Sequence, residues 1–238
     1  YFPISAFVGD NIVNTTEAMP WYKGTSLLDF LETIEISQNS YKEPRFQVQY
    51  VIRPQTEALH DYRGYAGEII SGTYRKGDAI VVLPEGISTK ISKIERNGEE
   101  VAEAKAGEPV VMHIEDNIDI SRGDYFASEE SEPTQSQEIE AIVCWMDKRA
   151  LKEGNKYLLQ QRSRLVKVVV KEIAYKIDVN TLDQEEEVES VKLNEIAKIR
   201  IKAAAPLVYD AFADNPPMGS AILIDETSNA TVGAVMIA

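Results

Sequence analysis

The chain has 238 residues, 44% of them hydrophobic and 27% charged, a globular composition that excludes a wholly disordered protein. Its 25 Lys and Arg against 39 Asp and Glu give a net charge of -14, which disfavours nucleic acid and anionic membranes as partners. The single cysteine, Cys144, excludes an internal disulfide and a multi-cysteine zinc site and fits a cytoplasmic protein. No apolar stretch approaches the roughly 20 residues needed to cross a bilayer, so we expect no membrane contact.

Residues 1–35 combine an apolar opening with one amphipathic helix. The segment from Tyr1 to Val8 is predicted to form a strand. Ser26 is a suitable cap for a helix whose leucines, Leu27 and Leu31 among them, recur at helical spacing. Because the chain begins with Tyr1 and shows no signal-peptide order, we interpret its start as a point inside a longer protein.

Residues 36–128 form a block in which the hydrophobic period changes to two. Short apolar runs alternate there with turns rich in Gly, Asn and Asp. The predicted strands are 46–53, 64–73, 79–83, 88–95, 109–114 and 124–127. Many short strands joined by tight turns indicate a closed barrel.

Residues 129–136 are polar, glutamate-rich and contain a proline, which predicts a solvated linker. A second strand-rich block, residues 137–238, follows. Its predicted strands are 139–146, 156–161, 164–170, 189–193, 195–201, 220–225 and 231–237. The fold class is therefore all-β, with two consecutive barrels after a short strand and helix remnant.

Chemical motifs are sparse in both blocks. We find no phosphate loop, no GxGxxG after a strand, no HExxH and no GxSxG, and we assign no catalytic or metal-binding residue. His60 and His113 are interpreted as structural, and the acidic run 183–187 as a solvated hairpin loop. The segment 215–219 is predicted to be a rigid exposed turn.

The N-terminal motifs resemble translational GTPases of the elongation factor Tu and 1A group. The matching segments are Phe2-Pro3-Ile4-Ser5-Ala6, Gly9-Asp10-Asn11 and Met19-Pro20-Trp21-Tyr22-Lys23-Gly24. By this resemblance Ser5 and Ala6 belong to the last guanine-recognition motif. The two barrels then correspond to the second and third domains of that group.

A finer match is to the large, GTP-binding subunit of bacterial sulfate adenylyltransferase. The segments that carry it are 46–54, 61–67, 118–124, 179–182, 192–196 and 224–233, which extend over nearly the whole chain. The resemblance implies a protein that couples GTP hydrolysis to formation of adenosine 5'-phosphosulfate from ATP and sulfate. It implies GTP and Mg²⁺ bound mostly upstream of Tyr1, so we expect no cofactor and no activity in this chain alone.

The resemblance also implies two partners: a small ATP-dependent sulfate adenylyltransferase subunit and the GTP-binding domain of the same protein. Tyrosine, arginine and glycine are clustered in one segment suited to docking, because Tyr and Arg supply large contact areas. The interface candidates are Asp61, Tyr62, Arg63, Gly64 and Tyr65. The alternative interpretation is that Tyr62 or Tyr65 only covers the end of the barrel.

Two other functions are compatible with the pattern. A translation elongation factor would bind aminoacyl-tRNA on equivalent barrels, and a structural module would only hold a complex together. The nearest feature to a basic patch is Arg162, Arg164, Lys167 and Lys171. Strand alternation separates the two arginines from the two lysines, so no single basic stripe results. Nucleic acid is therefore an unlikely partner.

Overall fold

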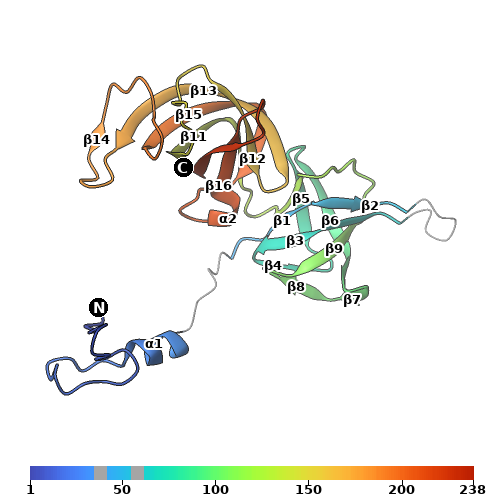
Figure 1. The fold of residues 1–238 in the computed structure, drawn as a ribbon. Coiled ribbons are helices and arrows are strands. Elements are labelled where there is room, and N and C mark those ends of the chain that lie inside the picture. The colour runs from blue at the N-terminus through green and yellow to red at the C-terminus, as the bar shows by residue number, and fades with distance from the viewer. Residues whose placement is uncertain (35–41, 55–61) are drawn as a thin grey trace. The chain divides into compact units, whose positions relative to one another are not determined.

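The computed structural model describes residues 1–34, 42–54 and 62–238, and the chain divides into two compact units, Tyr1–Ser40 and Tyr41–Ala238 (Figure 1). Asp61 and His60 lie outside the described residues.

The first unit is a looped segment closed by the predicted helix, α1 (Leu27–Thr33). Ser26 caps this helix as expected, since its Oγ accepts a hydrogen bond from Asp29 N at 3.2 Å. Asn11 organises the loops from a buried position: it donates to Pro3 O and accepts from Thr16 N, both at 2.9 Å. The strand predicted over residues 1–8 is reduced to one isolated bridge between Ser5 and Asp10, because the chain turns at residues 6–9.

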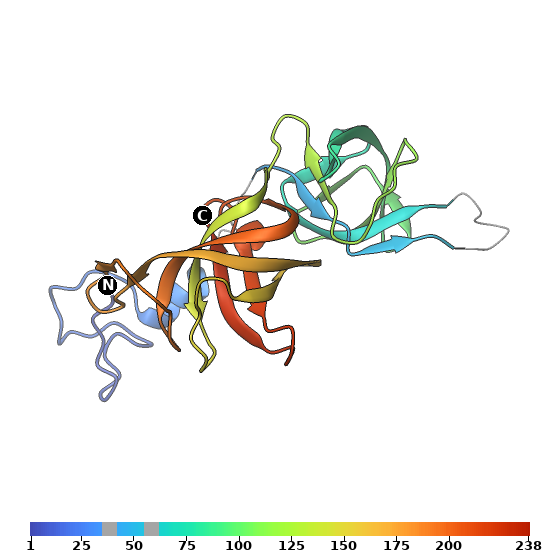
Figure 2. The same cartoon turned by 90° about the horizontal axis from the view of Figure 1, so that it is seen from above.

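The first barrel of the second unit is built from short antiparallel strands (Figure 2). Among the described residues six strands close the ring in the order β1-β10-β5-β6-β9-β3, with β3 returning to β1. Its strands are β1 (Arg45–Gln47), β2 (Tyr50–Ile52), β3 (Gly64–Ser71), β4 (Thr73–Arg75), β5 (Ala79–Leu83), β6 (Ile87–Arg96), β7 (Glu99–Val101), β8 (Glu103–Lys105), β9 (Pro109–Ile114) and β10 (Tyr125–Ser128).

One predicted strand of this barrel, 46–53, is divided in two. At the break, Val48 N donates to Asp124 O and Gln49 N donates to Ala66 O, so the chain changes its pairing partner between these residues. The break also shifts the alternation by one residue. Tyr50, predicted on the same face as Phe46, is exposed, while Val51 packs against the core.

The second barrel also closes through six strands of the described chain, in the order β12-β16-β17-β11-β15-β13, with β13 returning to β12. Together the two closed barrels confirm the predicted fold class. The elements of the second barrel are β11 (Thr134–Trp145), β12 (Lys156–Gln161), β13 (Arg164–Ile177), β14 (Gln184–Glu185), β15 (Ile196–Tyr209), α2 (Pro216–Gly219), β16 (Ser220–Ile224) and β17 (Thr231–Ile237).

Three details of the second barrel differ from the sequence prediction. β11 begins at Thr134, inside the predicted linker 129–136, because backbone pairing with β15 extends over polar side chains. The predicted strand 189–193 forms only one bridge, between Val191 and Leu151. The segment 215–219 is a buried helical turn rather than an exposed one, since Met218 packs into the structure and a Cβ on Gly219 would lie 2.3 Å from Phe212 N.

Each barrel has its own apolar interior, and a third apolar cluster joins the two barrels. In this cluster Val208 and Met218 of the second barrel pack against strands β5 and β10 of the first. The members from the first barrel are Val81, Leu83, Tyr125 and Ala127. The second unit is therefore two barrels sharing a buried interface.

A glycine at the centre of β3 allows the first barrel to close. A Cβ on Gly67 would lie 2.3 Å from Gln47 O and 3.0 Å from the Phe46 ring. We therefore expect Gly67→Ala to lower the free energy of unfolding by about 2 kcal/mol, because backbone and ring must both move. Urea unfolding followed by circular dichroism measures the change. The neighbouring exposed Glu68→Ala is the control, and equal stability of the two variants would contradict the prediction.

Candidate functional site

The outer surface of the first barrel carries a cluster of aromatic and charged side chains, which we call the Tyr62 face: Tyr50, Tyr62, Lys93, Glu95 and His113. Strand pairing positions it, because Tyr50, Ala66, Val111 and Glu95 are successive partners across β2, β3, β9 and β6. The residues between them along the strands point inward, as the complete burial of Tyr65, Ile94 and Met112 shows.

Gly64 lets Tyr62 lie across strand β3. A Cβ at this position would lie 3.2 Å from the Tyr62 ring and 2.5 Å from Val111 Cγ1. With no side chain there, the Tyr62 hydroxyl reaches across the sheet and donates a 2.9 Å hydrogen bond to Glu95 Oε2. The ring also packs edge-on against His113, with centroids 5.0 Å apart.

Glu95 is the electrostatic centre of the Tyr62 face. Lys93 forms an ion pair with it, and His113 Nε2 lies 3.5 Å from Glu95 Oε2. Burial acts to raise the pKa of Glu95, but the hydrogen bonds from Lys93 and Tyr62 and the nearby His113 outweigh it and lower the pKa below its ordinary value. Burial, then the bond to Glu95, raises the pKa of Tyr62 to about 12.

The other interface candidates have structural contacts. Arg63 Nη1 donates to Asn117 Oδ1 at 2.7 Å and to Ile118 O at 2.8 Å, which ties the start of β3 to the loop between β9 and β10. Tyr65 is wholly buried and donates to the same carbonyl at 3.4 Å. Gly64 is buried as well. Alternation turns Tyr65 into the core, which agrees with the alternative that it covers the barrel end, and docking by this segment stays a prediction.

Sequence reasoning missed four residues of this face: Tyr50, Lys93, Glu95 and His113. The sequence alone indicates a structural role for His113. Pairing the predicted strands 88–95 and 109–114 as antiparallel neighbours is the signal that places His113 beside Lys93. The outward position of Tyr50 could not be predicted, because the break between β1 and β2 shifts the alternation.

Ser5 and Ala6 lie in the first unit, where Ser5 O accepts from Gly9 N at 2.8 Å and Ala6 is exposed.

Part of the candidate basic patch is taken up by the contact between the barrels. The hairpin between β12 and β13 contacts the first barrel: Ser163 N donates to Gln47 Oε1 at 3.0 Å, and Arg164 Nη1 lies 3.6 Å from Asp124 Oδ1. Lys167 forms a 3.2 Å ion pair with Glu226. Arg164 thus serves the contact between the barrels, while Lys167 and Lys171 lie on the exposed surface.

Within the described part of the chain, no group of three or more His, Cys, Asp and Glu side chains is arranged to hold a metal ion. The described residues also include no helix with the length and apolar character that crossing a membrane requires.

Comparison with known proteins agrees with this description. Residues 138–238 match the family described as GTP-eEF1A C-terminal domain-like. The solved structure of sup35 complexed with GDP superimposes with a TM-score of 0.75 at 17% identity, over 99% of this chain and 57% of that chain. The chain thus has the fold of the paired barrels found in translation factors, and its second barrel is of the eEF1A C-terminal type.

Proteins with higher sequence identity to this chain are not translation factors by name. The bifunctional enzyme CysN/CysC of Mycobacterium tuberculosis is 42% identical over 237 residues, which is 99% of this chain and 39% of that protein. Sulfate adenylyltransferase subunit 1 of Buchnera aphidicola is 40% identical over 238 residues, 100% of this chain and 49% of that protein. The resemblance to the large subunit of sulfate adenylyltransferase is confirmed, and the chain spans less than half the length of these two relatives.

The lowered pKa of Glu95 predicts how the free energy of unfolding depends on pH. A carboxylate with a lowered folded pKa stabilises the fold above its unfolded pKa, and that contribution is lost as pH falls through the folded value. We expect Glu95→Gln to lower the free energy of unfolding by about 2 kcal/mol at pH 7, because Lys93 and Tyr62 lose a charged acceptor.

The difference in unfolding free energy between Glu95→Gln and the unsubstituted protein should shrink between pH 5 and about pH 3. Urea unfolding at a series of pH values measures it. Glu99→Gln, an exposed glutamate on β7, is the control and should show little effect at any pH. A Glu95→Gln penalty that stays constant down to pH 3 would refute the interpretation.

Proposed function

We propose that this chain is the two-barrel part of the large, GTP-binding subunit of a cytoplasmic sulfate adenylyltransferase. The observation that carries the proposal is the 40% identity, over 100% of the chain, to a protein named sulfate adenylyltransferase subunit 1. In the whole protein, GTP hydrolysis drives formation of adenosine 5'-phosphosulfate and pyrophosphate from ATP and sulfate. The barrels transmit this coupling by contact rather than by chemistry of their own.

Nucleotide binding belongs outside the barrels in this proposal. GTP and Mg²⁺ are held mainly by residues preceding Tyr1, and Ser5 and Ala6 form one edge of the guanine pocket. The exposed position of Ala6 and Phe7 supports this, because both are available to a neighbouring surface. The chain alone lacks a phosphate-binding loop, which supplies most of the electrostatic attraction for a nucleotide. It is therefore inactive by itself.

The Tyr62 face is a docking surface for either the GTP-binding domain or the small ATP-dependent subunit. Tyr62 and Arg63 are braced in place by Glu95 and Asn117, so they are already ordered before a partner arrives. Tyr50 beside them is 66% exposed and supplies unpartnered aromatic surface. Interfaces are enriched in this combination of tyrosine and arginine.

Binding of aminoacyl-tRNA on the barrels is the competing function. The contacts of Arg164 with Asp124 and of Lys167 with Glu226 count against it, because these cations already have carboxylate partners. The net charge of -14 acts in the same direction. A module that only holds a complex together is the remaining alternative.

The proposed function is tested on the full-length subunit together with the small subunit. We expect a stable complex that forms adenosine 5'-phosphosulfate faster when GTP is hydrolysed, measured by coupled pyrophosphate release. Calorimetry should show no GTP binding to residues 1–238 alone. Salt-sensitive binding of tRNA at micromolar protein in a filter assay, with no effect of GTP on sulfate adenylylation, would favour the translation alternative instead.

Docking on the Tyr62 face is tested by Tyr50→Ala in the full-length subunit. The side chain is exposed, so the thermal midpoint should stay unchanged while complex formation or sulfate-stimulated GTP hydrolysis falls about tenfold. Tyr50 is a cleaner probe than Arg63, whose removal also breaks the contacts to Asn117 and Ile118. Ile87→Ala, an exposed apolar residue at the other end of β6, is the control. If both variants behave like the unsubstituted protein, the face has no docking role.

A further inference from the structure

The second barrel presents exposed apolar side chains at one end, which we call the Leu182 surface: Met146, Val179, Leu182 and Leu193. Their exposed fractions are 53%, 59%, 75% and 43%. An isolated exposed apolar residue is ordinary, but several at one end of a domain mark an interaction site.

Backbone contacts bring the three segments of this surface together. Trp145 N donates to Glu195 O at 3.0 Å, and Asn194 N donates to Trp145 O at 2.8 Å, so Met146 and Leu193 flank one paired contact. A cavity of about 180 Å³ next to it is lined by Val179, Asn180 and Asn194 among others. The loop carrying Val179 and Leu182 therefore borders the segment that carries Leu193.

This loop is held in one shape by its own hydrogen bonds. Asp178 Oδ1 accepts from Asn180 N at 2.7 Å and from Thr181 N at 3.2 Å. Leu182 N donates to Asp178 O at 2.8 Å, and Asp178 N to Asp183 O at 3.0 Å. The apolar side chains at its tip are thus fixed outward before any partner binds, which lowers the entropic cost of association.

Leu182 has a backbone conformation that does not suit leucine. Its φ is 65°, in the left-handed region, where a residue with a Cβ costs about 1 kcal/mol relative to the right-handed form. Gly or Asn would be more stable in the isolated fold. Since the Leu182 side chain is mostly exposed, this cost is not offset by burial within the chain, and a partner that covers it would provide the burial.

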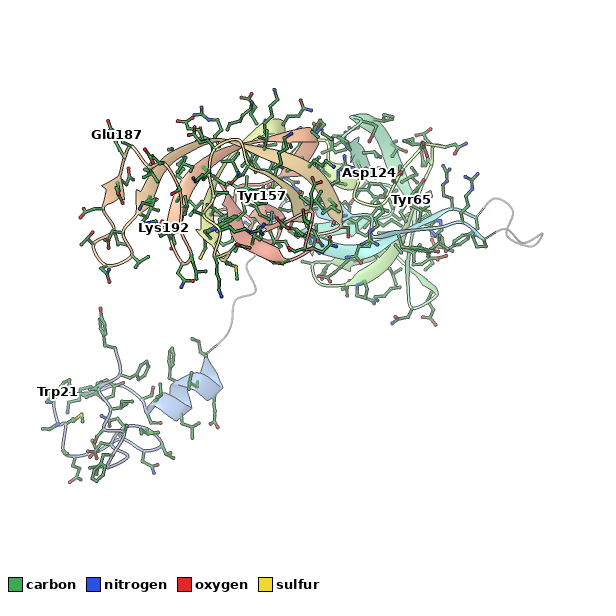
Figure 3. All side chains as sticks on the ribbon, turned by 45° about the horizontal axis from the view of Figure 1, so that its top comes forward. Trp21, Tyr65, Asp124, Tyr157, Glu187 and Lys192 are labelled. Carbon is green, nitrogen blue, oxygen red and sulfur yellow. The ribbon has the colours of Figure 1, made fainter. Side chains whose placement is uncertain are left out.

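Carboxylates outnumber lysines beside the Leu182 surface. Asp178, Glu185 and Glu195 line the cavity next to it, and Asp183 directly follows Leu182, whereas the nearby lysines are Lys176 and Lys192. Lys176 is already paired with Glu185 at 3.1 Å and Glu195 at 3.3 Å. Figure 3 shows Glu187 and Lys192 at the same end of the second barrel. The surroundings of the apolar centre are therefore predominantly negative.

We propose that the Leu182 surface docks a folded protein whose contact region has an apolar centre and a basic rim, and that this protein is the small subunit of the enzyme. The identity of the partner rests on the proposed function. A second copy of this chain would place the same acidic rim against itself and be repelled. Nucleic acid and anionic lipid are disfavoured by the same charges.

Leu182→Asn in the full-length large subunit separates binding from folding. Asn tolerates the left-handed conformation, so the thermal midpoint should stay the same or rise. Loss of the apolar side chain should weaken binding of the purified small subunit about tenfold or more, measured by calorimetry. Leu193→Gln should weaken binding as well, and binding by the unsubstituted protein should decrease with added salt. Leu165→Asn, 54% exposed on β13, is the matched control and should bind normally.

The outcomes distinguish the two proposals. If the unsubstituted subunit binds and both Leu182→Asn and Leu193→Gln bind equally well, this docking surface is refuted while the proposed function stands. The same holds if Leu165→Asn weakens binding as much as they do. If the unsubstituted full-length subunit does not bind the small subunit at all, the proposed function fails, and this docking proposal fails with it.

Discussion

The arrangement of the two barrels depends on a buried ion pair between residues 165 positions apart, Arg45 and Asp210. Two parallel hydrogen bonds form it, Nε to Oδ2 at 3.0 Å and Nη2 to Oδ1 at 3.1 Å, and Asn215 adds a third donor to Asp210 at 2.9 Å. Arg45 is only 3% exposed, so its charge is stable only while the second barrel supplies the carboxylate. The pair therefore penalises any separation of the barrels.

The apolar cluster between the barrels acts together with this pair. Met218 and Val208 pack against the first barrel beside the polar contact of Gln47 with Ser163, so apolar burial and hydrogen bonding both require the same arrangement. A buried polar contact adds specificity to apolar packing, because only one arrangement satisfies its donors. The Tyr62 face and the Leu182 surface are consequently carried on one unit, and a contact at one of them constrains the position of the other.

The sequence predicts the barrels well and their contacts poorly, for physical reasons. Strands with clear period-two alternation, such as β9 and β12, were predicted with their observed ends. Short strands such as β7 and β8 have too few residues to show a period. Tyr50 was misplaced because its strand changes partner at Val48. The burial of Met218 was missed because a turn-rich segment gives no sign that another barrel will cover it.

Similar barrels can serve different partners because the fold fixes only the backbone, while charge and shape are set by outward side chains. In this chain Arg164, one of the four cations of the candidate basic patch, contacts Asp124 of the first barrel. The outward charges that remain near Leu182 are mostly carboxylates, which repel a phosphate backbone and attract a basic protein surface. Two chains with the same pair of barrels can thus present different charges at the same place, and the backbone alone does not decide which partner binds.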